Sequence, residues 1–108
     1  MDTYRGGRQL DALGDESRRS IVVTLSRQGP LPVARLAEQL PISRPAVSQH
    51  LKVLASAGLV TARAEGTRRV YALDDSGLAD LREFFSSFWR QDLEDFAAHV
   101  CASLAVER

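Results

Sequence analysis

Two short amphipathic segments separated by a tight break constrain the fold of this chain more than any other feature. The first segment begins at Pro32, which suits the first turn of a helix, and stops before Pro41. Its apolar residues follow helical spacing: Val33, Leu36, Ala37 and Leu40. The second segment begins at Ser43, a favourable N-cap, tolerates Pro45 in its first turn and ends at Gly58. Residues 32–57 are therefore predicted to form two helices joined by a tight turn.

Helical spacing also predicts the elements on either side of this pair. Residues 8–13 are predicted to form a short helix that is broken at Gly14. Asp15 then caps a second helix, which ends at Gly29 and Pro30 and carries inward-facing apolar residues: Ile21, Val22 and Leu25. Residues 78–106 form one long closing helix, roughly 40 Å at about 1.5 Å per residue. Its apolar stripe is Leu78, Leu81, Phe84, Phe85, Phe88, Trp89, Leu93, Phe96, Val100 and Leu104.

A hairpin connects the helix pair to the closing helix. Residues 59–64 and 69–73 have strand-like content, and Gly66 lies in the turn of residues 65–68 between them. The predicted order is four helices, two strands and a fifth helix, in a single domain of residues 1–108. This is a mainly α fold with a small β-hairpin wing, the winged helix-turn-helix. In that layout the second helix of the pair enters the DNA major groove and the wing, residues 59–73, touches the backbone or the minor groove.

The distribution of charge agrees with a surface that faces DNA. The chain has 14 basic and 14 acidic residues, and its net charge is zero. Residues 43–73 nevertheless hold five basic side chains and one acidic side chain, whereas residues 74–108 hold three basic and eight acidic ones. The middle of the chain is therefore predicted to meet a polyanion, and the acidic closing helix offsets its charge.

A helical wheel centred on Val47 assigns the faces of the second short helix. Leu51 and Leu54 fall on the core side, and His50 lies about 60° from Val47, given about 100° per residue. His50 is therefore predicted to be a half-buried histidine at the edge of the core. The outer face is small, polar and basic: Pro45, Ser48, Gln49, Lys52 and Ser56.

This outer face has the chemistry of base and phosphate recognition. The amide of Gln49 matches adenine, and Ser43 and Ser48 can donate to a phosphate or to a base edge. Arg44 and Lys52 can neutralise phosphates. A solvated helix face has the same composition, so this face alone leaves both interpretations open.

The predicted wing favours the DNA interpretation. Arg63, Arg68 and Arg69 lie within seven residues around the glycine turn, and Glu65 is the only acidic residue among them. A hairpin that merely contacts solvent more often mixes its charges. Tyr71 is interpreted as a packing residue, with DNA contact as the alternative.

The chain resembles the ArsR-type winged-helix repressors over most of residues 10–96. The resemblance is carried by LGDESRRSIV, VARLAEQLPISRPAVSQHLKVLASAGLV and EGTRRVYAL. It implies a homodimer in which the first and last helices, residues 1–13 and 78–106, pair across a two-fold axis and the two reading helices enter successive major grooves. It implies that the residues of the second short helix that read the DNA, called the reading residues below, are Ser43, Arg44, Pro45, Ser48, Gln49, His50 and Lys52. It implies wing contacts from Thr67, Arg68 and Arg69.

The chain departs from the metal-sensing members of that family. Their Cys-x-Cys pair has no counterpart in the third helix, VARLAEQL, so thiolate sensing of a soft metal is excluded there. Asp92, Asp95 and His99 lie on neighbouring positions of the last helix. They are weak candidates for metal ligands, because zinc and similar metals usually bind more than one histidine or cysteine. A His/Asp pair that fixes the register of a dimer is the preferred interpretation. No cofactor is expected.

Aromatic residues on the last helix are interpreted as a dimer interface, with a small-molecule pocket as the alternative. The predicted interface comprises Leu10, Leu13, Leu81, Phe84, Phe85, Phe88, Trp89, Phe96 and Val100. Cys101 is expected to be inert, unless it is exposed with a lowered pKa, in which case it is a candidate redox switch or intersubunit disulfide.

The sequence therefore predicts a cytoplasmic homodimeric repressor that binds a palindromic operator and acts at its own promoter. The start MDTYRGGRQL has no apolar stretch behind a basic end, so no secretory signal is expected. No nucleophile and base, phosphate loop or metal cluster has workable spacing, so an enzyme is not expected. Two alternatives stay open: a repressor released by a metal or small molecule on the last helix, and a winged-helix module for protein contact.

Overall fold

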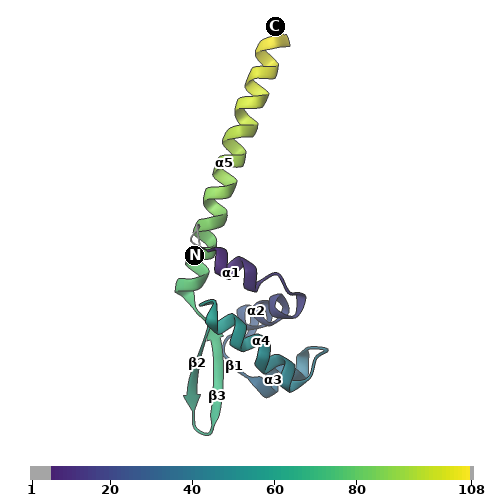
Figure 1. The fold of residues 1–108 in the computed structure, drawn as a ribbon, viewed down its shortest axis with the longest axis vertical. Coiled ribbons are helices and arrows are strands. Elements are labelled where there is room, and N and C mark those ends of the chain that lie inside the picture. The colour runs from purple at the N-terminus through teal and green to yellow at the C-terminus, as the bar shows by residue number, and fades with distance from the viewer. Residues whose placement is uncertain (1–5, 108) are drawn as a thin grey trace.

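A computed structural model describes residues 6–107 of the chain, apart from the side chains of residues 88 and 103–107. A small body carries one long helix that projects from it (Figure 1). The molecule measures 70 × 28 × 22 Å along its principal axes. The elements in chain order are α1 (Gly7–Ala12), α2 (Glu16–Gln28), β1 (Leu31–Pro32), α3 (Val33–Gln39), α4 (Arg44–Ser56), β2 (Val60–Glu65), β3 (Arg68–Leu73) and α5 (Asp75–Glu107).

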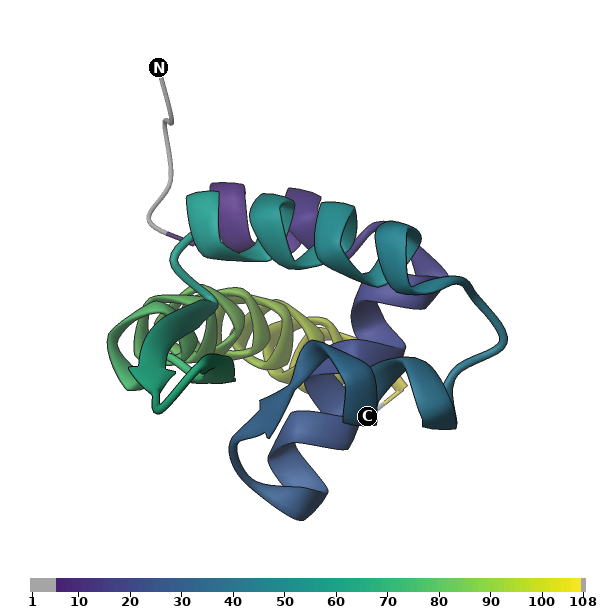
Figure 2. The same ribbon diagram turned by 90° about the horizontal axis from the view of Figure 1, so that it is seen from below.

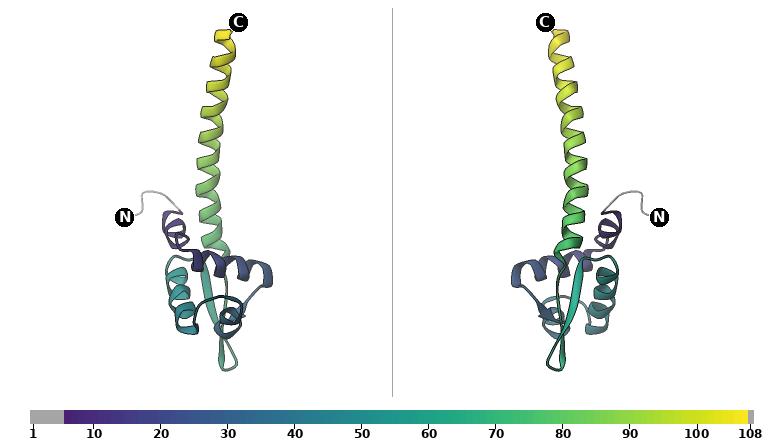
Figure 3. Two further views of the ribbon diagram at one scale, coloured as in Figure 1. Left: turned by 90° about the vertical axis from the view of Figure 1, so that its right-hand side faces the viewer. Right: turned by 90° about the vertical axis from the view of Figure 1, so that its left-hand side faces the viewer.

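The body packs α2, α3 and α4 around an aliphatic core, and the wing and α5 leave it at opposite ends (Figure 3). The fully buried side chains are Ile21, Leu36, Val47, Leu51, Leu54 and Leu59. Val47, Leu51 and Leu54 recur on one face of α4, as the helical spacing predicted. The opposite face of α4 is therefore left on the surface of the body.

Side-chain caps begin both α2 and α4, as predicted. The Asp15 carboxylate accepts a hydrogen bond from the backbone N–H of Arg18 at 3.1 Å, and Ser43 Oγ accepts one from the N–H of Ala46 at 3.2 Å. The N–H of Arg18, aided by the nearby charge of His50, lowers the pKa of Asp15 below its ordinary value. The N-cap residues in the sequence therefore correctly predict the residues at which α2 and α4 begin.

The sheet has one more strand than the predicted hairpin. Leu31 and Pro32 form the short strand β1, which pairs antiparallel with β3 opposite Tyr71 and Val70. Pro32 was predicted in the first turn of the third helix and instead precedes it as its N-cap residue. The strand order is β1-β3-β2, so β1 lies at an edge, where a proline without an N–H is tolerated. This strand attaches the start of α3 to the wing.

Helix α5 begins three residues before the predicted start at residue 78. Asp74 caps it, because its carboxylate accepts hydrogen bonds from the N–H of Ser76 at 2.9 Å and from Ser76 Oγ at 2.7 Å. These bonds lower the pKa of Asp74. The helix has 33 residues and is roughly 50 Å long at about 1.5 Å per residue. None of the helices between residues 6 and 107 combines the length and the apolar character that a membrane span requires.

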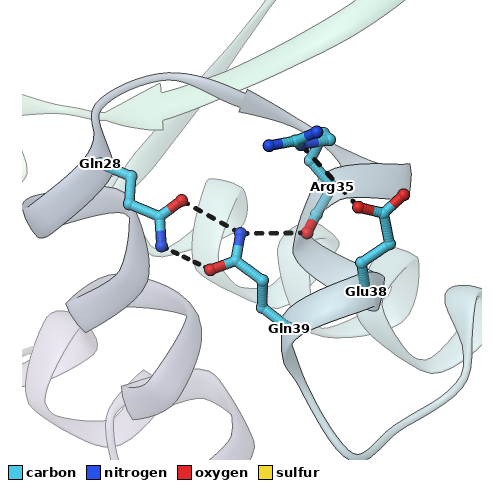
Figure 4. A network of polar contacts seen from close by, with 4 residues as sticks. All are labelled: Gln28, Arg35, Glu38 and Gln39. Atoms are coloured by element: carbon cyan, nitrogen blue, oxygen red, sulfur yellow. Dashed lines mark hydrogen bonds and ion pairs between the residues drawn. The ribbon is translucent and has the colours of Figure 1, made fainter.

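Polar side chains tie α2 to α3 near their C-terminal ends (Figure 4). Gln28 and Gln39 exchange a reciprocal pair of amide hydrogen bonds, and Gln39 also donates to the backbone carbonyl of Arg35 at 3.2 Å. These contacts join the first helix of the helix-turn-helix pair to the helix before it.

Candidate nucleic-acid interface

Six of the seven predicted reading residues lie on α4, and Ser43 precedes this helix as its N-cap. Ser43, Arg44, Pro45, Gln49 and Lys52 are exposed, and Ser48 and His50 are half-buried. Figure 2 views the molecule from below, with α3, α4 and the wing in front and α5 receding behind them. The polar and basic face of α4 is exposed on the side of this helix opposite the aliphatic core.

His50 belongs to the edge of the core, as predicted. Its side chain is 21% exposed, and its Nδ1 atom lies 3.9 Å from Oδ1 of Asp15, the cap of α2. When His50 is protonated, this contact is an ion pair between α4 and α2. His50 thus supports the position of α4, and Gln49 beside it is free to point outward.

The wing separates its arginines onto two faces. Arg63 is paired with Val70, Arg68 with Glu65, and Arg69 with Ala64 in the β2–β3 register. Residues directly opposite share a face and neighbours alternate, so Arg63 and Arg68 lie on one face and Arg69 on the other. Glu65 pairs with both residues of the first face, at 3.5 Å from Arg63 and 3.8 Å from Arg68. The sequence showed the cluster but not this division.

The turn of the wing is shorter than predicted. Glu65 and Arg68 belong to the strands, which leaves Gly66 and Thr67 as the two turn residues. Gly66 has φ +64°, and among the described residues only glycines have a positive φ. Glycine with positive φ at the first turn position is the pattern of a type II′ hairpin. Thr67 is thereby exposed at the tip of the wing between Gly66 and Arg68.

The end of α4 is held from two sides. The buried side chain of Gln9 in α1 donates to the carbonyl of Ala57 at 3.0 Å, and Arg8 donates to that of Ser56 at 2.5 Å. From α5, the backbone of Gly77 packs directly on the backbone of Gly58. The two helices predicted to form the dimer interface therefore both contact the end of α4.

An apolar face is exposed along α5. Exposure reaches 60% for Trp89, 61% for Leu93 and 66% for Phe96. Of the other predicted interface residues, Leu10 and Phe85 are exposed, Leu13, Leu81, Phe84 and Val100 are half-buried, and the Phe88 side chain lies outside the described residues. Leu13 also packs against the core of its own chain. Leu93 belongs to the same face and was left out of the predicted interface.

The weak metal candidates stay exposed on α5. Asp95 accepts a hydrogen bond from Gln91 at 3.1 Å. Within residues 6–107, no group of three or more His, Cys, Asp and Glu side chains is placed to hold a metal ion. Cys101 is a free and exposed thiol.

Arg35 is a candidate interface residue that sequence reasoning missed. It lies on α3, in the same cleft as Arg44 and the arginines of the wing tip. The position of Arg35 in the helical pattern does not indicate this role, because Arg35 and the wing are brought together only when β1 pairs with β3.

Comparison with known proteins assigns the family. The family described as a helix-turn-helix domain matches residues 13–63. The HTH-type transcriptional regulator Rv2034 of Mycobacterium tuberculosis is 55% identical over 98 residues, 90% of this chain and 91% of that protein. The arsenical resistance operon repressor of Escherichia coli is 35% identical over 88 residues, 82% of this chain and 75% of the repressor.

A solved structure shares the fold. The solution NMR structure of a homodimeric winged helix-turn-helix DNA-binding domain from Mycobacterium bovis, a possible ArsR-family transcriptional regulator, matches with a TM-score of 0.61 and 33% identity. The match covers 79% of this chain and 76% of that one. The sequence identity and the winged architecture agree, and the chain belongs to the ArsR-type family of winged helix-turn-helix transcriptional regulators.

Proposed function

We propose that this chain is a homodimeric repressor that inserts α4 into the DNA major groove and places its wing against the backbone or the minor groove. One observation carries the proposal: α4 buries Val47, Leu51 and Leu54 while its opposite, polar and basic face stays exposed beside the arginines of the wing. In this role Gln49 reads a base, and Arg44, Lys52 and the wing arginines bind phosphates.

The exposed face of α5 supports the dimer. At about 100° per residue, Phe85, Trp89 and Phe96 fall within about 40° of one another on the helix surface. A second copy of this face would cover these aromatic side chains, and the M. bovis relative is a homodimer. Two reading helices related by a two-fold axis match a palindromic operator. The protein then represses in the cytoplasm, without a catalytic role, by occluding polymerase at promoters that include its own.

Two substitutions test the division between phosphate contacts and base reading. We expect Arg69→Ala to weaken binding to all duplexes and to reduce the slope of log Kobs against log salt by about one unit, because one phosphate contact is lost. We expect Gln49→Ala to relax discrimination at one base pair and to leave the salt slope unchanged. Fluorescence anisotropy titrations of operator and random duplexes at several salt concentrations measure both effects. Wild-type affinities for both variants would refute the proposed surface.

A further inference from the structure

A cleft of about 360 Å³ lies between the tip of the wing and the starts of α3 and α4. We name it the wing cleft. It is lined by the apolar segment of residues 32–34, where β1 runs into α3, and by Arg35, Arg44, Thr67, Arg68 and Arg69. Four arginines from three separate elements therefore border one hollow, an arrangement suited to a phosphate, which arginine binds through paired N–H donors.

The positive charge of the wing cleft is only partly balanced. Arg35 Nε lies 3.9 Å from the Glu38 carboxylate, and Arg68 Nη2 lies 3.8 Å from that of Glu65. All four side chains are more than half exposed, and such surface pairs contribute little and exchange partners readily. Arg44 and Arg69 make no ion pair with any residue of the described part of the chain. At least two guanidinium groups are thus available to an anion without breaking a contact.

The position of the wing cleft fits one part of a DNA duplex. If α4 occupies a major groove and the wing reaches the adjacent minor groove, the sugar-phosphate strand that separates these grooves must pass between them. The wing cleft lies in that gap, because Arg44 is the first residue of α4 and Thr67 is in the turn of the wing. The apolar lining suits deoxyribose, and the arginines suit the phosphates that flank it.

On the basis of the DNA binding proposed above, we propose that the wing cleft seats this strand of the DNA backbone, with Arg35 as a phosphate-binding residue. Arg35 and Arg44 hold the phosphate from one side, and the tip of the wing holds it from the other through Arg69, which makes no ion pair among the described residues. The contact carries no base information. It sets the distance between the wing and α4 on the duplex, and so fixes the register in which Gln49 meets its base.

The test combines a protein substitution with removal of single phosphate charges. The full-length protein and its Arg35→Gln variant are titrated with duplexes of one operator, each carrying one neutral methylphosphonate at a different backbone position. The matched control is Arg90→Gln, an exposed arginine on α5 outside the cleft. Arg35→Gln is expected to fold normally, because the Arg35 side chain is 61% exposed and its replacement leaves no cavity. Circular dichroism checks the fold of each variant.

We expect one backbone position between the major groove read by α4 and the adjacent minor groove to stand out. Neutralising it weakens the wild type and Arg90→Gln about tenfold, the effect of losing one charged hydrogen-bond partner, and weakens Arg35→Gln by a smaller factor, because one of the arginines that hold this phosphate is already gone. Arg35→Gln also loses about one unit of salt slope on the unmodified operator. If Arg35→Gln matches Arg90→Gln at every position while both bind with a steep salt slope, the wing cleft assignment is wrong and the DNA-binding function stands. If the wild type itself binds duplex DNA without salt dependence, the proposed function fails, and the cleft assignment with it.

Discussion

We expect replacement of Gly77 by alanine to lower the free energy of unfolding by about 3 kcal/mol or more, the upper end of overpacking costs. The added Cβ atom would stand 1.7 Å from the carbonyl oxygen of Gly58 and 2.6 Å from its carbonyl carbon. These backbone atoms cannot rotate aside as a side chain would, because the N–H groups of Gly58 and Leu59 are hydrogen-bonded to the last turn of α4 at 3.0 and 2.9 Å. Helix α5 must then separate from α4. Urea denaturation followed by circular dichroism measures the loss.

Gly7→Ala is the matched control for this substitution. Gly7 is the first residue of α1, and a Cβ atom built there meets nothing within 4 Å. Alanine at a helical position that accepts it stabilises a protein by about 0.4–1 kcal/mol, because it restricts the unfolded chain. If Gly77→Ala proves as stable as Gly7→Ala, the close contact between α5 and the end of α4 does not exist.

The second large effect is expected from Phe96→Glu, which places a charge in the centre of the exposed apolar face of α5. Phe96 is 66% exposed in the single chain, so the substitution should leave the fold intact. Burying the new carboxylate against a second copy is costly, and the apolar contact of the ring is lost as well. The variant is expected to be monomeric in sedimentation equilibrium. It should also bind a palindromic duplex at least about a hundredfold more weakly, because two linked half-sites no longer act together.

Ser87→Glu separates this effect from the added charge alone. Ser87 is exposed and lies nine residues before Phe96, about 180° away around the helix at about 100° per residue. The two variants carry the same charge on opposite faces of α5. Ser87→Glu is expected to dimerise and to bind the palindrome as the wild type does. A dimeric Phe96→Glu variant would mean that the aromatic face is not the interface.

Local signals in the sequence predicted the helices of the body and the reading face. The caps Asp15 and Ser43 are recognised from residue type and spacing alone, and each makes the hydrogen bond expected of it. The buried seam of α4 follows from the helical period, which depends on no distant part of the chain. The edge position of His50 followed from the same wheel and was confirmed by its contact with Asp15.

Contacts between distant segments could not be predicted in this way. Strand β1 has two residues, too few to show a period, and its partners Tyr71 and Val70 lie about 40 residues later. The role of Gly77 is visible only in the structure, where the absence of a side chain allows α5 to approach Gly58. The place of Arg35 in the wing cleft depends on both the β1–β3 pairing and the wing turn.

The most direct test of the central claim is selection of bound sequences from a pool of random duplexes, followed by hydroxyl-radical footprinting of the selected site with the wild-type protein. We predict an enriched inverted repeat whose two half-sites are centred one helical turn apart, about 10 base pairs or roughly 34 Å, with both halves protected. Enrichment should be lost with Phe96→Glu and altered at one position of each half-site with Gln49→Ala. A pool that shows no enrichment, or a protected site without two-fold symmetry, would contradict the assignment of this chain as a dimeric DNA-reading repressor.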